Sequence, residues 1–262
     1  MKIFVLAYKN QRLLLNLIKN DFKNRYLGNH LGIVWAFIQP LVMVMVYWFV
    51  FVHGFRATPV SNVPFLLWLL TGMVPWFLIN DTITSASSAI TSQSFLVKKI
   101  VFEVKLLPIV KIGSAVMVNL AFWVLMLIVC ICYGYYPNLM WLQLIYYMIC
   151  ILALSLSLSL FLSAVMPFML DVGQIVTIFM QLMFWATPIF WNKDLLKGHM
   201  VLIYKLNPFS YIVIGFRDSL IDHTLILEHY NQTIYFWCLT AFLFWFGNRT
   251  FNKLRPHFAD VL

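Results

Sequence analysis

Long apolar runs separated by short polar segments dominate the hydropathy pattern of this chain. The longest run extends from Leu31 to Val52. An α-helix of about 20 mainly apolar residues is long enough to cross the hydrocarbon core of a bilayer, and soluble domains do not repeat such runs. The pattern therefore predicts six membrane-spanning helices, over Leu31–Val52, Val63–Thr82, Ile109–Tyr133, Trp141–Met166, Ile175–Trp191 and Ile234–Phe251.

The composition agrees with this pattern. The 262 residues are 63% hydrophobic and 10% charged, and no stretch is polar enough to form a separate soluble domain. We therefore expect an all-α polytopic membrane protein, with residues 1–262 forming a single transmembrane domain. The four cysteines fall inside apolar runs without metal-ligand spacing, and we interpret them as small buried hydrophobic residues.

The basic residues predict the orientation of the chain. A cytoplasmic N-terminus leaves five of the 18 Lys and Arg residues on the outer side. Because cytoplasmic connections are enriched in Lys and Arg, we expect both termini in the cytoplasm. The net charge of +9 then reflects topology and not a nucleic-acid partner.

Small residues recur at helical spacing in the fourth predicted span. Ser155, Ser159 and Ser163 stand at i, i+4 and i+8. Such a stripe allows close approach of another helix, which we favour over a polar path through the membrane.

Residues 1–30 form an amphipathic segment before the first span. Leu13, Leu14 and Leu17 recur at helical spacing, and polar and basic residues occupy the opposite side. We expect a helix in the membrane interface, where its cations meet anionic phosphates. It serves either as a simple anchor or as a contact for a lipid substrate.

Two further segments are neither spans nor simple loops. Residues 83–108 mix apolar residues with charge, and we expect a short cytoplasmic helix there that fits a groove on a partner protein. A helix on the membrane surface is the alternative. Residues 192–230 are long for a connection, so we expect short re-entrant or interfacial helices on the outer side.

Polar stripes on two spans are candidates for a translocation path. Glutamine amides are costly in hydrocarbon unless they pair with another helix or meet water. The alternative to a translocation path is that these glutamine side chains form hydrogen bonds between helices and line no pore. We assign Trp76, Trp141 and Trp191 first to the interfacial aromatic belt. The candidate channel-lining residues are Trp35, Gln39, Met43 and Tyr47 in the first span and Gln174, Thr177, Gln181 and Trp185 in the fifth.

The chain contains no motif for energy coupling or catalysis. A phosphate-binding loop of the form Gly-x-x-x-x-Gly-Lys-Ser/Thr is absent, as are a Gly-x-Ser-x-Gly elbow and a cluster with metal-ligand spacing. We expect no enzyme activity and no bound cofactor or metal. A chain that moves a solute uphill without these motifs must use a motor in another subunit.

The stretch from Asp21 to Pro40, DFKNRYLGNHLGIVWAFIQP, resembles the entry to the first span in the permeases of type-2 ABC transporters that export polysaccharides. The resemblance continues through residues 95–108, through Thr187-Pro-Ile and through Asn207-Pro with Arg217, so that it covers essentially the whole chain.

The resemblance implies a homodimer of six-span subunits bound to two ATPase subunits, which hold ATP and Mg. Such a complex exports lipid-linked O-antigen polysaccharide across the bacterial inner membrane. The implied site residues fall into three groups. They are Arg12, Lys19, Lys23 and Arg25 for contact with the lipid pyrophosphate or the interface, Phe95, Lys98, Lys99, Phe102 and Glu103 for ATPase coupling, and Asn207, Pro208 and Arg217 for a periplasmic gate.

The motifs do not separate an O-antigen permease from an exporter of capsule or teichoic acid, and drug exporters share the architecture. A membrane-embedded enzyme that acts on lipid-linked sugars would need acidic residues grouped at the membrane surface. Asp21, Asp81, Glu103 and Asp171 are too scattered in the sequence to favour it.

Overall fold

The computed structural model describes residues 2–26, 32–56, 63–97, 103–192 and 197–262, and its regular elements within these ranges are helices. Four helices are long and apolar enough to cross a membrane. They are α3 (Val34–Phe49) with a π-helical turn, η1 (Val50–Gly54), α4 (Phe65–Ser87), α6 (Leu106–Cys132), and η3 (Leu139–Leu142) joined to α7 (Gln143–Val165). The predicted all-helical fold is therefore confirmed for the described residues, which include four candidate membrane spans.

The last two predicted spans differ from the first four. Helix α8 (Val172–Ala186) has 15 residues, fewer than the 20 or so that a bilayer requires, because the backbone becomes extended at Thr187. Helix α11 (Tyr230–Leu254) has 25 residues, but it carries amide side chains near both ends and basic side chains near its C-terminal end, and it does not reach the hydropathy of the other four. Six spans therefore remain a prediction.

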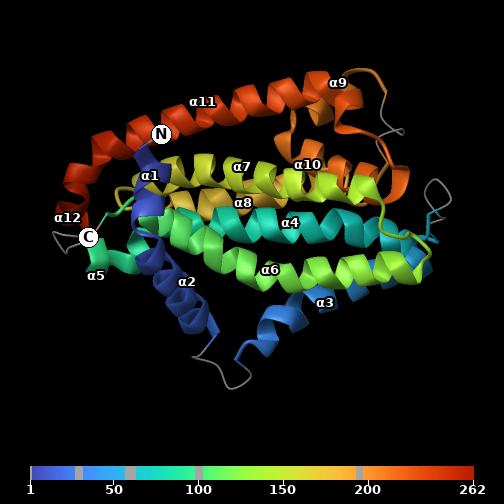
Figure 1. Ribbon diagram of the computed structural model, residues 1–262, viewed down its shortest axis with the longest axis horizontal. Coiled ribbons are helices and arrows are strands. Elements are labelled where there is room, and N and C mark those ends of the chain that lie inside the picture. The colour runs from blue at the N-terminus through green and yellow to red at the C-terminus, as the bar shows by residue number, and fades with distance from the viewer. Residues whose placement is uncertain (1, 27–31, 57–62, 98–102, 193–196) are drawn as a thin grey trace.

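Helix α4 is the central helix of the bundle. Of the residues in the apolar stretch that could span a membrane, 78% are buried inside the protein in α4, whereas only 6% are buried in the span formed by α3 and η1. A helix that is apolar on all sides is typically buried, and α4 lies against α6, α7, α8 and α10 (Figure 1). Helix α3 lies at the edge of the bundle and exposes apolar side chains such as Met45 and Phe49.

The serine stripe lies in a closely packed helix interface, as predicted. Ser155, Ser159 and Ser163 are buried, and the hydroxyl oxygens of Ser155 and Thr82 on α4 are 2.7 Å apart. On α11, a Cβ added to Gly247 would lie 2.8 Å from the carbonyl oxygen of Ser157. Small residues on both sides therefore allow α7 to pack closely against α4 and α11.

The N-terminal segment forms two helices, α1 (Lys2–Lys9) and α2 (Gln11–Tyr26), where the sequence predicted one interface helix. The break falls at Asn10, whose side-chain amide donates to the Leu6 carbonyl at 3.0 Å. Helix α2 crosses the bundle at an angle (Figure 1), and its Leu14 packs on Leu106 and Val110 of α6.

The remaining segments form short helices at the two ends of the bundle. Helix α4 continues five residues past the predicted Thr82, and α6 begins before the predicted Ile109. Helices α1, α5 and α12 lie at one end, and α9 lies toward the other (Figure 1). The short elements are η2 (Thr91–Gln93), α5 (Ser94–Val97), α9 (His199–Leu206), α10 (Pro208–Arg217), η5 (Asp218–Asp222), η6 (Ile226–His229), η7 (Arg255–His257) and α12 (Phe258–Val261).

Candidate functional site

A cavity of about 680 Å³ lies among α3, α4, α6 and α8, with one side chain contributed by α2. Most of the candidate channel-lining residues line this cavity. Gln174 is exposed on α8 and is not among the lining residues. The predicted residues that line the cavity are Trp35, Gln39, Met43, Tyr47, Thr177, Gln181 and Trp185.

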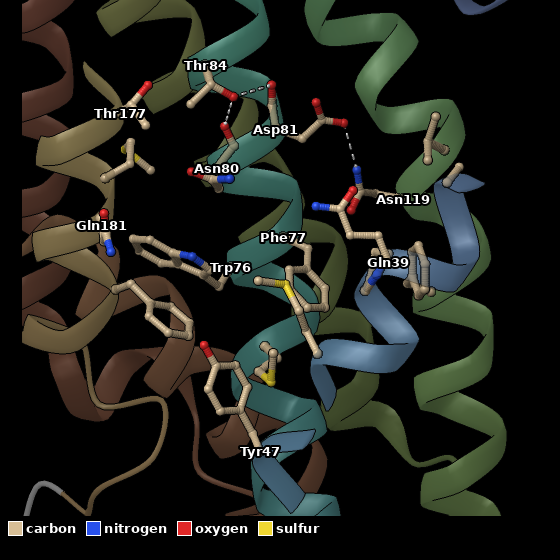
Figure 2. Close-up of a pocket in the computed structure, with 18 of the residues that line it drawn as sticks. Gln39, Tyr47, Trp76, Phe77, Asn80, Asp81, Thr84, Asn119, Thr177 and Gln181 are labelled. Carbon is tan, nitrogen blue, oxygen red and sulfur yellow. Dashed lines mark hydrogen bonds between the residues drawn. The ribbon is translucent and has the colours of Figure 1, made fainter. Parts of the chain in front are cut away.

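Helices α4 and α6 supply lining residues that sequence reasoning missed. Asn80, Asp81 and Thr84 of α4 and Asn119 of α6 face the cavity (Figure 2). Trp76 lies at the midpoint of α4, is 4% exposed and lines the same cavity, so its assignment to an interfacial belt was wrong. The available signal was the spacing of Asn80, Asp81 and Thr84 at the polar C-terminal part of an otherwise mainly apolar helix, because residues three and four apart share one face.

One wall of the cavity is aromatic. The ring of Tyr47 lies 5.9 Å from that of Phe184, which lies 5.6 Å from the ring of Trp76. Phe77 and Phe122 also line the cavity, and the centres of their rings are 6.2 Å apart. These contacts fix the rings, so the wall presents flat apolar faces beside the amides of Gln39 and Gln181.

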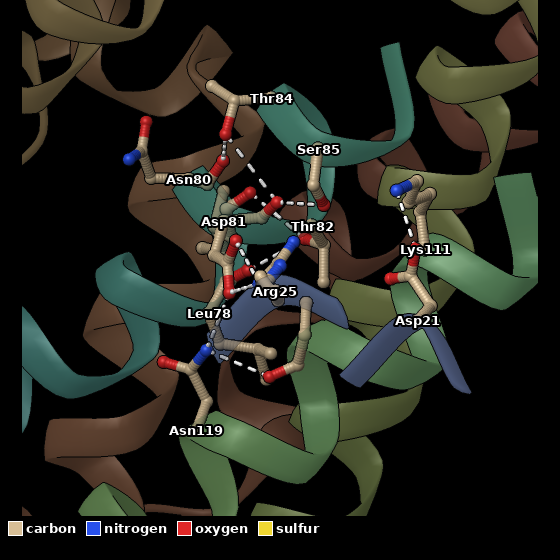
Figure 3. Close-up of polar contacts among 12 residues, drawn as sticks. Asp21, Arg25, Leu78, Asn80, Asp81, Thr82, Thr84, Ser85, Lys111 and Asn119 are labelled. Carbon is tan, nitrogen blue, oxygen red and sulfur yellow. Dashed lines mark hydrogen bonds and ion pairs between the residues drawn. The ribbon is translucent and has the colours of Figure 1, made fainter. Parts of the chain in front are cut away.

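The polar end of the cavity contains an ion pair between α2 and α4. The Nη1 atom of Arg25 lies 2.9 and 3.0 Å from the two carboxylate oxygens of Asp81 (Figure 3). The side-chain amide of Asn119 donates to one of these oxygens at 3.3 Å and to the carbonyl of Ala115 at 2.9 Å. Arg25 therefore lies inside the cavity, whereas Arg12, Lys19 and Lys23 are exposed on α2.

The cavity opens on the side between α3 and α8. Trp35 and Met43 of α3 are 47% and 42% exposed, and Trp185 of α8 is 54% exposed. All three line the cavity, so a molecule beside these helices has access to it.

The predicted gate residues meet the end of α8. The Asn207 side chain caps α10 by accepting from the Phe209 amide at 3.0 Å, and its amide donates to the Thr187 hydroxyl at 3.1 Å. Pro208 occupies the first turn of α10, where a missing N–H is tolerated. Arg217, at the other end of α10, donates to the carbonyls of Pro188 and Ile189.

Arg217 is almost fully buried, at 3% exposed, and also donates to the Trp68 carbonyl of α4 at 3.2 Å. Its guanidinium carbon lies 3.8 Å from the centre of the Trp68 ring. Burial lowers the pKa of Arg217 to about 9, a shift that Asp222 and Asp218 oppose, so the group stays charged at neutral pH. Trp68, Arg217, Asp218 and Asp222 all line a second cavity of about 360 Å³.

The candidate ATPase contacts are only partly described. Phe95 of α5 is 71% exposed, and Lys98, Lys99 and Phe102 lie outside the described residues. Glu103 forms an ion pair of 3.2 Å with Arg255 of η7. The adjoining Val104 packs with Phe251 and Phe258, so the C-terminal end of α11 holds the start of α6.

Comparison with known proteins places these features in a family. Residues 12–221 match the family model described as ABC-2 type transporter. The chain is 27% identical over 255 residues to the O-antigen export system permease protein RfbA of Klebsiella pneumoniae, with 95% of each chain covered. It is 26% identical over 263 residues to the protein of the same name from Myxococcus xanthus, with 97% of each chain covered.

Proposed function

Since this chain belongs to the ABC-2 type transporter family, we propose that it is the membrane-spanning permease subunit of an exporter for O-antigen polysaccharide. The relatives that carry this name match the chain over almost their whole length. The chain has no phosphate-binding loop, so ATP hydrolysis with Mg takes place in a separate ATPase subunit.

The observation that carries the proposal is the chemistry of the 680 Å³ cavity. Sugar rings have apolar C–H faces and polar hydroxyl edges. The aromatic wall around Trp76 and Phe184 suits the C–H faces, and the amides of Gln39, Gln181 and Asn119 suit the hydroxyls. A surface that combines both kinds of contact binds successive sugars without fixing any one of them tightly.

The open side of the cavity supports a homodimer. Helices α3 and α8 expose apolar side chains on both sides of the opening, among them Val42, Met43, Leu182 and Trp185. A second copy that packs against these helices would bury those side chains and convert two open cavities into one enclosed channel.

The proposed orientation places both termini in the cytoplasm of a bacterium and all six predicted spans in its inner membrane. Two ATPase subunits then bind residues 83–108, where Phe95 offers an exposed apolar anchor and the sequence also supplies Lys98, Lys99, Phe102 and Glu103. Asn207, Pro208 and Arg217 hold the periplasmic gate at the end of α8.

The test is export by a strain in which this chain has been deleted and then restored. Wild-type protein should restore O-antigen chains at the cell surface, measured as the ladder of lipopolysaccharide bands on a gel. Gln181→Leu should slow the appearance of long chains, because the leucine cannot exchange hydrogen bonds with sugars. Gln174→Leu on the same helix is the matched control and should export normally, because Gln174 lies outside the cavity.

Two results would count against the proposal. Unchanged surface O-antigen in the deletion strain would exclude this cargo, and loss of a capsular polymer instead would identify a different polysaccharide. Equal export rates for wild type and Gln181→Leu would exclude the cavity as the path.

A further inference from the structure

The second cavity, of about 360 Å³, lies where several helices begin or end. Trp68 belongs to the first turn of α4, Pro188 and Asn192 follow the end of α8, and His229 directly precedes α11. These points lie at the end of the bundle away from α5 and α12 (Figure 1). The volume falls within the range of about 300–1,000 Å³ that is typical of small-molecule sites. The cavity is therefore large enough to hold a small molecule.

Three residues that line the cavity carry a buried polar atom without a hydrogen-bond partner among the described residues. These atoms are Nε1 of Trp68, Nε of Arg217 and Oγ1 of Thr224. The other two nitrogens of the Arg217 side chain donate to the carbonyls of Trp68, Pro188 and Ile189, so that only its Nε–H is left. Because buried polar groups are almost always hydrogen-bonded, these three atoms point to a molecule in the cavity.

The Thr224 hydroxyl is not needed to hold its own segment. The backbone amide of Thr224 donates to the Asp218 carbonyl at 3.0 Å. The backbone carbonyl of Thr224 accepts from the side-chain amide of Gln143, the first residue of α7, at 3.0 Å. These two contacts fix the residue through its backbone and leave the hydroxyl for a ligand.

Three carboxylates supply acceptors to the same cavity. Asp222 and Glu228 are exposed, whereas Asp218 is buried and its Oδ2 atom lies 3.2 Å from Nε2 of His229. One oxygen of Glu228 accepts from the Leu225 amide at 3.3 Å, and a carboxylate can accept about four hydrogen bonds. The cavity therefore combines buried N–H donors with carboxylate acceptors.

This combination selects among ligand chemistries. An ammonium group only donates, so it cannot satisfy the N–H groups of Trp68 and Arg217. A phosphate group accepts hydrogen bonds but is repelled by three carboxylates that outnumber the one guanidinium. Among the described residues, no group of three His, Cys, Asp or Glu is arranged to hold a metal ion. A hydroxyl both donates and accepts, so an uncharged molecule with several hydroxyls fits the site best.

A single short segment separates this cavity from the first one. Pro188 lines the second cavity. The ring of Phe190 lies 5.0 Å from that of Tyr47 and 5.2 Å from that of Phe184, and both of these residues line the first cavity. Arg217 holds the same segment through the Pro188 carbonyl. A polymer that leaves the first cavity past Phe190 therefore reaches the second directly.

We propose that the second cavity binds one uncharged sugar residue of the exported polymer, at a site separate from the first cavity. The Thr224 hydroxyl and the N–H groups of Trp68 and Arg217 contact the sugar hydroxyls, and the Asp218 carboxylate accepts from them. A sugar held there keeps the polymer from sliding back while the first cavity takes up the next sugars. The inference rests on the proposed function in taking a polysaccharide as the cargo.

The experiment measures how sugars protect a thiol in each cavity. It uses the full-length chain in phosphatidylcholine nanodiscs, with Cys132→Ser and Cys238→Ser to remove the exposed thiols. Ile214→Cys then places a thiol in the second cavity, and in a separate protein Met43→Cys places one in the first. The rate of reaction with N-ethylmaleimide is measured with and without the methyl glycosides of glucose, galactose and mannose. Ethanolamine and inorganic phosphate are the charged control ligands.

A glycoside that binds the second cavity should slow labelling there about threefold at twice its dissociation constant, because only the unoccupied site reacts. Ethanolamine and phosphate should not slow it. Thr224→Val should raise the glycoside concentration for half-protection about fivefold, as expected for one lost neutral hydrogen bond, and Thr224→Ser by less than about twofold. Thr224→Val should not lower the thermal midpoint, because the hydroxyl has no protein partner to lose. Gln181→Leu is the matched control and should weaken protection only in the first cavity.

Three outcomes would overturn the inference. If no glycoside slows labelling in the second cavity, the cavity holds water only. The inference is also wrong if ethanolamine or phosphate protects as well as the glycosides, or if Thr224→Val leaves protection unchanged. The thiol in the first cavity tests the proposed function separately, since absence of protection there, with protection retained in the second cavity, counts against the first cavity as the path and not against this site.

Discussion

Replacing Arg217 with methionine removes a buried cation that joins α10, α4 and the end of α8. The guanidinium donates to the carbonyls of Trp68, Pro188 and Ile189. A hydrogen bond to a charged group contributes about 1.5–3 kcal/mol, so three would total roughly 4–9 kcal/mol if they were independent. They share one side chain, and water from the adjacent 360 Å³ cavity can reach the carbonyls. We therefore expect a loss of about 3–5 kcal/mol in the free energy of unfolding.

The buried cysteines provide the assay. Cys130 and Cys150 are 0% exposed, whereas Cys132 and Cys238 are exposed. In a background with Cys132→Ser and Cys238→Ser, a thiol-reactive fluorophore should react only as the bundle opens on heating. At roughly 2–4 °C per kcal/mol for a chain of this size, the midpoint for Arg217→Met should fall by at least about 6 °C.

Arg249→Met is the matched control, because Arg249 is exposed on α11 with its guanidinium carbon 5.6 Å from the centre of the Trp245 ring. Exposed substitutions usually change stability by less than about 0.5 kcal/mol, or about 2 °C here. Equal shifts in the two variants would refute the account of Arg217 as the residue that joins the three segments.

Two further predictions concern the α7–α11 interface and the C-terminal end. Gly247→Ala should destabilise the protein by about 1–3 kcal/mol in the same thiol assay, because its methyl group meets the Ser157 carbonyl. Gly54→Ala meets no atom closer than 4.0 Å and is its control, so similar midpoints would contradict the close packing. Glu103→Arg and Arg255→Glu should each reduce surface O-antigen with little loss of stability, since an exposed pair contributes about 0.2–1 kcal/mol. The double exchange should restore export, and failure to do so would show that the pair does not position this segment.

Much of the fold could be predicted from the sequence, because apolar length alone indicates a membrane-spanning helix. Four predicted spans match helices of that length, and the resemblance based on the Asp21–Pro40 stretch is confirmed by the family match. The end of α8 was misjudged because Ile189, Phe190 and Trp191 are apolar, although an extended backbone at Thr187 has already ended the helix. Hydropathy does not distinguish an apolar helix from an apolar turn that is buried by its neighbours.

The candidate site could be predicted only where polarity is restricted to one face. Gln39 and Gln181 were found because they interrupt apolar helices at regular spacing, and both line the cavity. Trp76 and Phe77 of α4 could not be found in this way, because the residues on either side of them, from Met73 to Ile79, are apolar on every face of the helix. Nor could the partner of Arg25, since Asp81 lies 56 residues away in the sequence and its approach depends on how α2 crosses the bundle.

The shallow attachment of α3 at the edge of the bundle has a consequence for divergence among related permeases. Only 6% of its apolar window is buried, so most substitutions on its outward face leave the core untouched and are constrained instead by whatever adjoins the helix. The fold of the protein and the cargo selectivity to which such a helix contributes can therefore change independently. Proteins with different cargoes should therefore differ more along α3 than along α4, even where their overall architecture is the same.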